Sequence, residues 1–482
     1  MKRIFCLFFG IVFIVASFIP LCTYAGVKTN EYDAGIQNVG IELQSNFDIE
    51  TVLYDSLINC EKQIDLTSFS INASDINDLA LDYYNFLYNN PDLFYVSTGF
   101  SYATNSLTNK IVYIIPNYTM DESEISDARV IYESGIRKAL RLVDNTMTDL
   151  QKALVIHDYI CNTASYPKLI YDGSTLTNDS PLFHSAYGFF SNAKVVCEGY
   201  TNAYTAILKR LGIEAKMVSS STMNHAWNVV KINGNWYNAD LTFDDPVMDS
   251  DNYSSFYGIF NHTYFLKSND YFTNSAPTKH TGIVYPENVQ CNDTSYDDYF
   301  WNNIIGYVGV HDGDYYYMDC NTSAQGLVDI DILKRDLKGN TERMNTDAYK
   351  ALCSKIGDIT RPNAQLVPYE GKLYFSCTRF SGSNIVSEIY VINYDKTYYK
   401  FDQISGSGIT VYFALSIVNG DLGYLSYTDL TNNKFTYNVF SRSERFPELY
   451  KNSSYDAYVD VNNDGVINAK DYAYIAHNEF LC

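Results

Sequence analysis

The chain has 482 residues, of which 46% are hydrophobic, so it is long enough for two to four folded domains and is not wholly disordered. Its 34 basic and 56 acidic residues give a net charge of −22. A surface with this excess of negative charge repels nucleic acids and anionic membranes, so neither is expected as a partner, whereas calcium is favoured.

The first 25 residues have the pattern of an export signal. Lys2 and Arg3 form a positive start, an apolar run extends to Ile19, and cleavage is expected after Ala25. A membrane anchor is the alternative, but the run is short for a span and no stop-transfer flank follows. We therefore expect a secreted protein, extracellular or associated with the cell surface, with no membrane segment after cleavage.

Residues 26–135 predict a mixed α/β region. Apolar residues at helical spacing run from 76 to 87, and Pro91 ends the pattern. An apolar run at 111–115 predicts a strand. This region precedes the segment in which the candidate catalytic residues lie.

Residues 136–285 contain a candidate nucleophile at a helix start. A helix is predicted after Thr148, which forms a capping-box pattern with Gln151. A second helix is predicted from Cys197 to a stop at Gly212. Cys197 would meet the positive end of the helix dipole, where the thiolate is favoured. Alone, such a cysteine is more often structural.

A hairpin predicted after this helix supplies a candidate base and its partner. If Asn233-Gly234 is the centre of the turn, paired residue numbers add up to 467, and Asp240 lies opposite Trp227. His225 then lies two residues along on the same face, within reach of the Asp240 carboxylate. A shift of one residue would separate the two side chains. The spacing therefore predicts a His–Asp pair that could activate a thiol.

The motifs CEGY, NHAW and NADLTFDDP, which contain Cys197, His225 and Asp240, closely resemble the transglutaminase-like superfamily. The segments IHDYICNTASYP and SAYGFF upstream resemble its bacterial members. The resemblance covers roughly residues 145–285 and implies an α+β chain with a papain-like core. His157 and His280 are interpreted as structural residues.

The activity implied by the resemblance is acyl transfer through a thioester on Cys197. His225 would act as base and acid, and Asp240 would orient the imidazole. The expected substrate is a peptide or isopeptide amide bond in a protein or peptide, and hydrolysis is favoured. Protein cross-linking is the first alternative, and a non-catalytic binding or assembly role is the second.

Residues 290–440 predict a β-rich repeat domain. Three passages, HDGDYYYMD, YEGKLYFSC and VNGDLGYLSY, each place a polar turn with glycine before an aromatic strand. Their spacing resembles the blades of a propeller, but three are too few to close one, so a β-meander or partial propeller-like domain is expected. A polar linker is expected at 441–455.

Residues 456–482 contain a loop with the oxygen spacing of a calcium site. Gly465 stands where such a loop turns sharply. The loop, with the helix expected after it, resembles a single dockerin repeat, although dockerins have two. The resemblance implies structural calcium and a cohesin module, or a cell-wall component, as partner in an extracellular polysaccharide-degrading complex. The expected calcium ligands are Asp460, Asn462, Asp464, Val466, Asn468 and Asp471.

Overall fold

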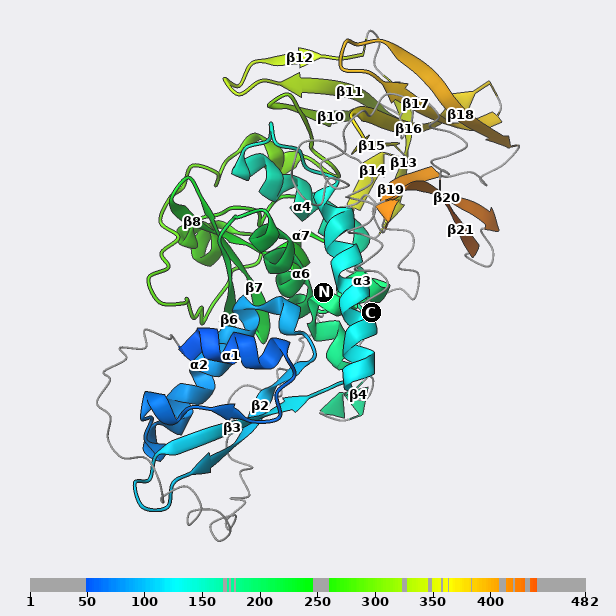
Figure 1. Cartoon of the computed structure of the whole chain (residues 1–482). Coiled ribbons are helices and arrows are strands. Elements are labelled where there is room, and N and C mark those ends of the chain that lie inside the picture. The colour runs from blue at the N-terminus through cyan, green and yellow to red at the C-terminus, as the bar shows by residue number, and fades with distance from the viewer. Residues whose placement is uncertain are drawn as a thin grey trace. The chain divides into compact units, whose positions relative to one another are not determined.

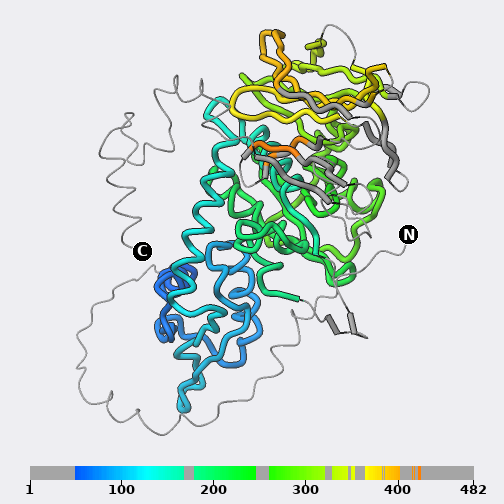
Figure 2. Tube along the Cα trace, turned by 90° about the vertical axis from the view of Figure 1, so that its right-hand side faces the viewer, coloured from blue at the N-terminus to red at the C-terminus, as the bar shows by residue number. Residues whose placement is uncertain are grey.

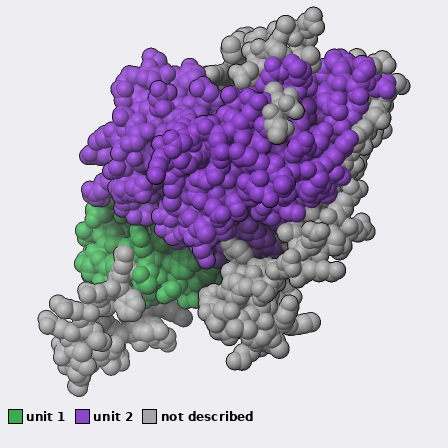
Figure 3. Space-filling model, turned by 90° about the horizontal axis from the view of Figure 1, so that it is seen from above, with its two compact units in different colours: residues 1–129 green, residues 130–482 purple. Residues whose placement is uncertain are grey.

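The computed structural model describes residues 49–439 with gaps at 168–170, 173–174, 177–178, 246–259, 323–326, 346–348, 357–358, 363, 383, 407–412, 419–420 and 430–433. The expected signal, linker and calcium module lie outside the described residues. The chain divides into two compact units, residues 1–129 and 130–482, coloured separately in Figure 3. Among the helices that the structure describes, none combines the length and hydropathy of a membrane-crossing segment.

Unit 1 combines helices with a small antiparallel sheet of order β1-β3-β2. Its elements are α1 (Ile49–Ile58), β1 (Ile64–Asp65), η2 (Thr67–Phe69), η3 (Ala73–Asp75), α2 (Ile76–Asn89), η4 (Pro91–Leu93), β2 (Val96–Thr104) and β3 (Ile111–Tyr118). The apolar faces of α1 and α2 share one core with the sheet, which includes Leu57, Tyr83 and Ile114. The predicted helix at 76–87 and strand at 111–115 are confirmed.

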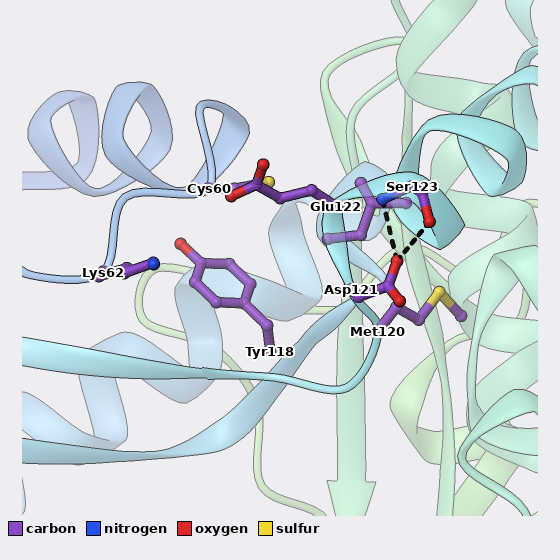
Figure 4. A pocket seen from close by; sticks show the side chains of 8 residues that line it. Cys60, Lys62, Tyr118, Met120, Asp121, Glu122 and Ser123 are labelled. Atoms are coloured by element: carbon purple, nitrogen blue, oxygen red, sulfur yellow. Dashed lines mark hydrogen bonds between the residues drawn. The ribbon is translucent and has the colours of Figure 1, made fainter.

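A surface hollow of ≈ 440 Å³ lies in unit 1 at the start of α3 (Glu122–Leu140), as Figure 4 shows. The Asp121 carboxylate points back to the helix, where its Oδ1 accepts hydrogen bonds from the backbone N–H groups of Ser123 and Glu124, each at 2.9 Å. This is the geometry of a helix cap. The Asp121 carboxylate in this hollow therefore caps the start of α3.

Unit 2 begins within α3 and contains the segment predicted to be catalytic. The helices and short strands are α4 (Asp149–Thr163), β4 (Tyr171–Asp172), β5 (Thr175–Leu176), η5 (Pro181–His184), α5 (Ala186–Asn192), α6 (Cys197–Arg210), α7 (Leu241–Asp244), η7 (Tyr271–Ser275) and η8 (Phe300–Asn303). The capping box predicted at Thr148 and Gln151 is confirmed at the start of α4.

A three-stranded antiparallel sheet of order β6-β7-β8 packs against α6 (Figure 1). Its strands are β6 (Ala215–Ser220), β7 (His225–Ile232) and β8 (Asn235–Ala239). Asn228 pairs with Ala239 and Ile232 with Asn235, which is the register predicted from the sequence. Positive φ angles of 51° at Asn233 and 85° at Gly234 form the tight turn.

The β-rich part of unit 2 consists of consecutive antiparallel meanders, which can be followed from green to orange in Figure 2. The first sheet contains β9 (Gly309–His311), β10 (Asp314–Thr322), β11 (Leu327–Arg335), β12 (Thr341–Arg343), β13 (Tyr349–Ile356) and β14 (Ile359–Pro362). The second contains β15 (Ala364–Tyr369), β16 (Lys372–Ser381), β17 (Asn384–Ile392) and β18 (Tyr398–Gly406), and the third β19 (Phe413–Val418), β20 (Asp421–Asp429) and β21 (Lys434–Val439). The described strands close no barrel or propeller.

The three repeated passages are equivalent hairpins. In each sheet the passage joins the first two strands, with His311 opposite Asp314, Tyr369 opposite Lys372, and Val418 opposite Asp421. The first two sheets share an apolar core. The repeat in the sequence thus marks the beginning of each sheet.

Polar side chains of α4 hold this β-rich region through its backbone. Gln151 donates to the Gly313 carbonyl at 2.7 Å. Asp158 accepts from the Val308 N–H at 2.8 Å, and Asn162 donates to the Ile417 carbonyl at 3.1 Å. Positions 151, 158 and 162 share one helical face. The meanders are therefore anchored to the helix that precedes the candidate active site.

Candidate active site

Cys197 is the first residue of α6 and is only 2% exposed. The residue before it is Val196, whose aliphatic side chain makes no capping hydrogen bond. The first amides of a helix point their N–H groups outward, and the positive end of its dipole favours an anion there. The structure therefore places Cys197 where the sequence predicted, at a position that stabilises a thiolate.

Gly199 has a packing role in the first turn of α6. A Cβ atom at this position would lie 2.5 Å from the Phe183 carbonyl oxygen and 2.5 Å from the Val195 Cβ. The groups that approach this position belong to η5, before α5, and to the segment between α5 and α6.

His225 and Asp240 form a direct pair, with His225 Nε2 2.7 Å from Asp240 Oδ2. Asp240 follows the last residue of β8 and also caps α7, because its Oδ1 accepts from the Phe243 N–H at 3.1 Å. An ionised carboxylate only accepts hydrogen bonds, so His225 carries its proton on Nε2. Nδ1 of His225 is then the nitrogen that can take a proton from a thiol.

His280 is a second histidine on the same carboxylate, a role that its position in the sequence did not predict. Its Nε2 lies 2.8 Å from Asp240 Oδ2, and the residue is fully buried. The ring sits among aromatic side chains, with centroid distances of 4.3 Å to Phe272 and 4.9 Å to Trp227. Burial disfavours an ionised Asp240, but His225 and His280 outweigh it and hold the pKa of Asp240 well below its usual range.

The packing of α6 on β7 brings the starts of these two elements to the same end. Asn228 donates to the Thr201 carbonyl at 3.2 Å and to the Thr205 hydroxyl at 2.9 Å. Thr201 is one helical turn after Cys197, and Asn228 is three strand positions after His225. Lys231, near the end of β7, donates its backbone N–H to the Glu214 carbonyl just after α6 at 2.9 Å, so the two elements run in the same direction. The first residues of both elements, about 6 Å and about 10 Å before the Asn228 contact, therefore lie on the same side of it.

A second buried network lies on α4 beside the pair. His157 Nδ1 is 2.9 Å from Asp158 Oδ1, and His157 Nε2 is 3.2 Å from Asp244 Oδ2. His262 Nε2 also contacts Asp158 Oδ1, at 2.8 Å. Burial opposes a charge on His157, but its hydrogen bonds to Asp158 and Asp244 raise its pKa well above the ordinary value. The interpretation of His157 as a packing residue is therefore incomplete: it joins two carboxylates.

This network contains its own cysteine, histidine and aspartate, but it lacks the features of a nucleophilic site. Cys161 Sγ is 3.6 Å from His157 Nε2 and 3.5 Å from the Leu241 carbonyl oxygen. Burial raises the pKa of Cys161 to about 12. Cys161 also lies within α4, away from the positive helix end. It is therefore a protonated, structural thiol.

The two clusters are also the candidate metal sites among the described residues: His157, Asp158 and His262 in one, and His225, Asp240 and His280 in the other. In the first, both nitrogens of each ring and both oxygens of Asp158 contact protein groups. In the second, Asp240 Oδ2 accepts from both rings. The hydrogen bonds explain both arrangements without an ion.

Residues 137–241 match the transglutaminase-like superfamily. This segment is a transglutaminase-like domain. Members of the superfamily are cysteine-dependent acyl-transferases or peptidases, and Cys197, His225 and Asp240 all fall within the matched range. The family match therefore agrees with the resemblance seen in the sequence motifs.

Similar proteins include the kyphoscoliosis peptidases of Mus musculus and Homo sapiens, each 22% identical over 161 residues. The match covers 30% of this chain and 23% of each relative, so the chain spans about a quarter of the length of these relatives. A solved structure described as "Crystal structure of a TGase" aligns with 33% of this chain and 48% of that chain, at 13% identity and a TM-score of 0.22. The family match, not this weak structural likeness, identifies the transglutaminase-like domain.

Proposed function

We propose that the transglutaminase-like domain is a cysteine-dependent enzyme that hydrolyses peptide or isopeptide amide bonds. The observation that carries this proposal is the 2.7 Å contact of Asp240 with His225, the first residue of β7, on the strand that packs against the helix beginning with Cys197. A base with a fixed tautomer beside a thiol at a helix start is the arrangement that nucleophilic catalysis needs. The second histidine on Asp240 supports the same assignment, because it keeps the carboxylate ionised.

The reaction would proceed in two acyl-transfer steps. His225 Nδ1 takes the proton of Cys197, and the thiolate attacks the amide carbonyl carbon. The imidazolium then returns the proton to the leaving amine as the C–N bond breaks and a thioester forms. Water, deprotonated by His225, attacks the thioester and releases a carboxylic acid and the thiol. Asp240 keeps the ring oriented and stabilises its charged form.

Hydrolysis is favoured over cross-linking because the curated relatives are named peptidases. In the cross-linking alternative, an amine replaces water in the second step, and the first step is unchanged. A non-catalytic binding role is the third alternative. The retained pair of His225 and Asp240 argues against it, since a binding protein has no need of an oriented base.

The proposal is tested with a panel of peptide and isopeptide amides, with and without an added primary amine. We expect acid and amine products from the parent protein and none from Cys197→Ala. Cys161→Ala is the matched control and should retain turnover, because it removes a buried thiol whose raised pKa keeps it protonated. Equal turnover by parent and Cys197→Ala would exclude the mechanism. Products joined to the added amine would show that the enzyme catalyses cross-linking and not hydrolysis.

We also propose that the protein is secreted and that the loop from Asp460 to Asp471 binds structural calcium. The support is the sequence pattern alone. A cohesin module or a cell-wall component is the proposed partner of the calcium module. Titration calorimetry with calcium should give heat that Asp460→Ala abolishes, and the absence of heat in the parent protein would exclude the site.

A further inference from the structure

A charged cluster adjoins the candidate nucleophile Cys197 and contains neither His225 nor Asp240. Glu198 follows Cys197 directly in α6, and its carboxylate contacts Nδ1 of His184, the last residue of η5. The other nitrogen of His184, Nε2, lies 2.8 Å from Asp179 Oδ1. Both ring nitrogens are therefore engaged by carboxylates of this chain. His184 cannot act as a base or bind a substrate without breaking one of these contacts.

The segment that carries His184 is fastened to the first turns of α6 by its backbone as well. Val196 N–H donates to the Phe183 carbonyl at 2.9 Å, and the Asn202 amide donates to the His184 carbonyl at 2.8 Å. The Phe183 carbonyl is also the group that a side chain at Gly199 would strike. The cluster is thus held at a fixed place beside Cys197.

The charges of the cluster affect the ionisation of Cys197 because the cluster is held beside this residue. The Glu198 side chain is only 8% exposed, so solvent screens its negative charge poorly. A carboxylate near a thiol disfavours the thiolate, against the effect of the helix dipole. Burial disfavours a charge on His184, but hydrogen bonds to Asp179 and Glu198 raise its pKa to about 10. The ring is therefore a cation at neutral pH.

We propose that His184 is a positioning residue that holds the Glu198 carboxylate and offsets its charge beside the Cys197 thiolate. This proposal rests on the proposed function, because it takes Cys197 as the nucleophile. His184 touches no reacting atom and acts through Glu198. Substitution of His184 or of Glu198 therefore changes the charge beside Cys197 one unit at a time.

Three variants separate the charge effect from a structural one. The cluster of one cation and two carboxylates has a net charge of about −1 at neutral pH, by the ordinary charges of these groups. H184Q makes it one unit more negative, E198Q makes it one unit less negative, and the double variant restores the parent value. Other titratable groups near the start of α6 stay unchanged in all variants: Tyr200, His225, Asp240 and Asp245.

The experiment measures iodoacetamide modification of the Cys197 peptide by mass spectrometry from pH 4 to pH 10. We expect the midpoint of the rate to rise by about one pH unit in H184Q and to fall in E198Q. The double variant should return to the parent midpoint. H311Q is the matched control, because His311 is a similarly exposed histidine beside an aspartate, at 3.4 Å, and its midpoint should not move.

A uniform loss of rate in H184Q at every pH, without rescue in the double variant, would overturn the proposal in favour of a purely structural role. If H184Q does not fold, the downward shift in E198Q decides alone, and an unmoved midpoint there refutes the charge effect. Alkylation reads the thiol directly and does not depend on turnover. If the parent protein has no amide turnover but the midpoints follow the expected order, the proposed enzymatic function is refuted and the role of His184 stands. If the parent protein is active but the midpoints do not follow that order, the role of His184 is refuted and the enzymatic function stands.

Discussion

Replacing Asp158 by asparagine should destabilise unit 2 by about 3–5 kcal/mol. The Asp158 carboxylate is 1% exposed and accepts from His157 at 2.9 Å, His262 at 2.8 Å and the Val308 N–H at 2.8 Å. Asparagine keeps the volume but replaces one acceptor by a donor and removes the charge. Each lost bond to a charged group costs about 1.5–3 kcal/mol, and breaking a buried ion pair from one side costs about 3–5 kcal/mol.

Urea unfolding followed by tryptophan fluorescence measures this loss in unit 2 specifically. All three tryptophans, Trp227, Trp236 and Trp301, lie in that unit. The control is Asp149→Asn on the same helix: Asp149 is exposed and lies 3.9 Å from Lys152, so its loss should cost at most about 1 kcal/mol. If Asp158→Asn costs no more than this control, the buried network does not hold the unit together.

Three further outcomes are expected. His280→Phe keeps a ring in the aromatic site but removes a hydrogen bond to Asp240, and kcat/KM should fall about 10- to 100-fold in amide turnover assays; an unchanged value would deny His280 a role. The folded-state pKa of Asp240 lies below the ordinary 3.8, so the stabilisation of the folded state by this carboxylate is lost as pH falls. The folded-state pKa of His157 lies above the ordinary 6.5, so its stabilisation of the folded state is complete below pH 6.5 and is lost as pH rises. Urea unfolding should therefore show a stability maximum between about pH 4 and pH 6.5, and a maximum above pH 8 would contradict these assignments. Gly199→Ala should cost about 1–3 kcal/mol, because the new methyl group meets the Phe183 carbonyl, and a neutral result in the same measurement would show that the segment before α5 shifts freely.

The features that the sequence predicted are those set by local spacing. The turn at Asn233-Gly234 fixes the register of β7 and β8, and the two-residue period of a strand then places His225 near Asp240. The helix start at Cys197 follows from the apolar periodicity of α6. The capping box at Thr148 is likewise a pattern within four residues.

The features that it missed depend on contacts between distant segments. His280 reaches Asp240 across 40 positions, and His262 reaches Asp158 across 104. No periodicity predicts such pairs. A signal was present nonetheless, because five of the chain's seven histidines lie between residues 157 and 280, within the matched segment or in the 40 residues after it. The anchoring of the β-rich region by α4 was missed for the same reason.

Acylation by a small activated ester tests most directly whether Cys197 is the nucleophile. The parent protein, treated with p-nitrophenyl acetate and quenched in acid, should carry an acetyl group on the Cys197 peptide in mass spectrometry. His225→Gln should form this thioester much more slowly, because the thiol loses its base. An acetyl group on another cysteine, or equal labelling of Cys197 with and without His225, would contradict the account.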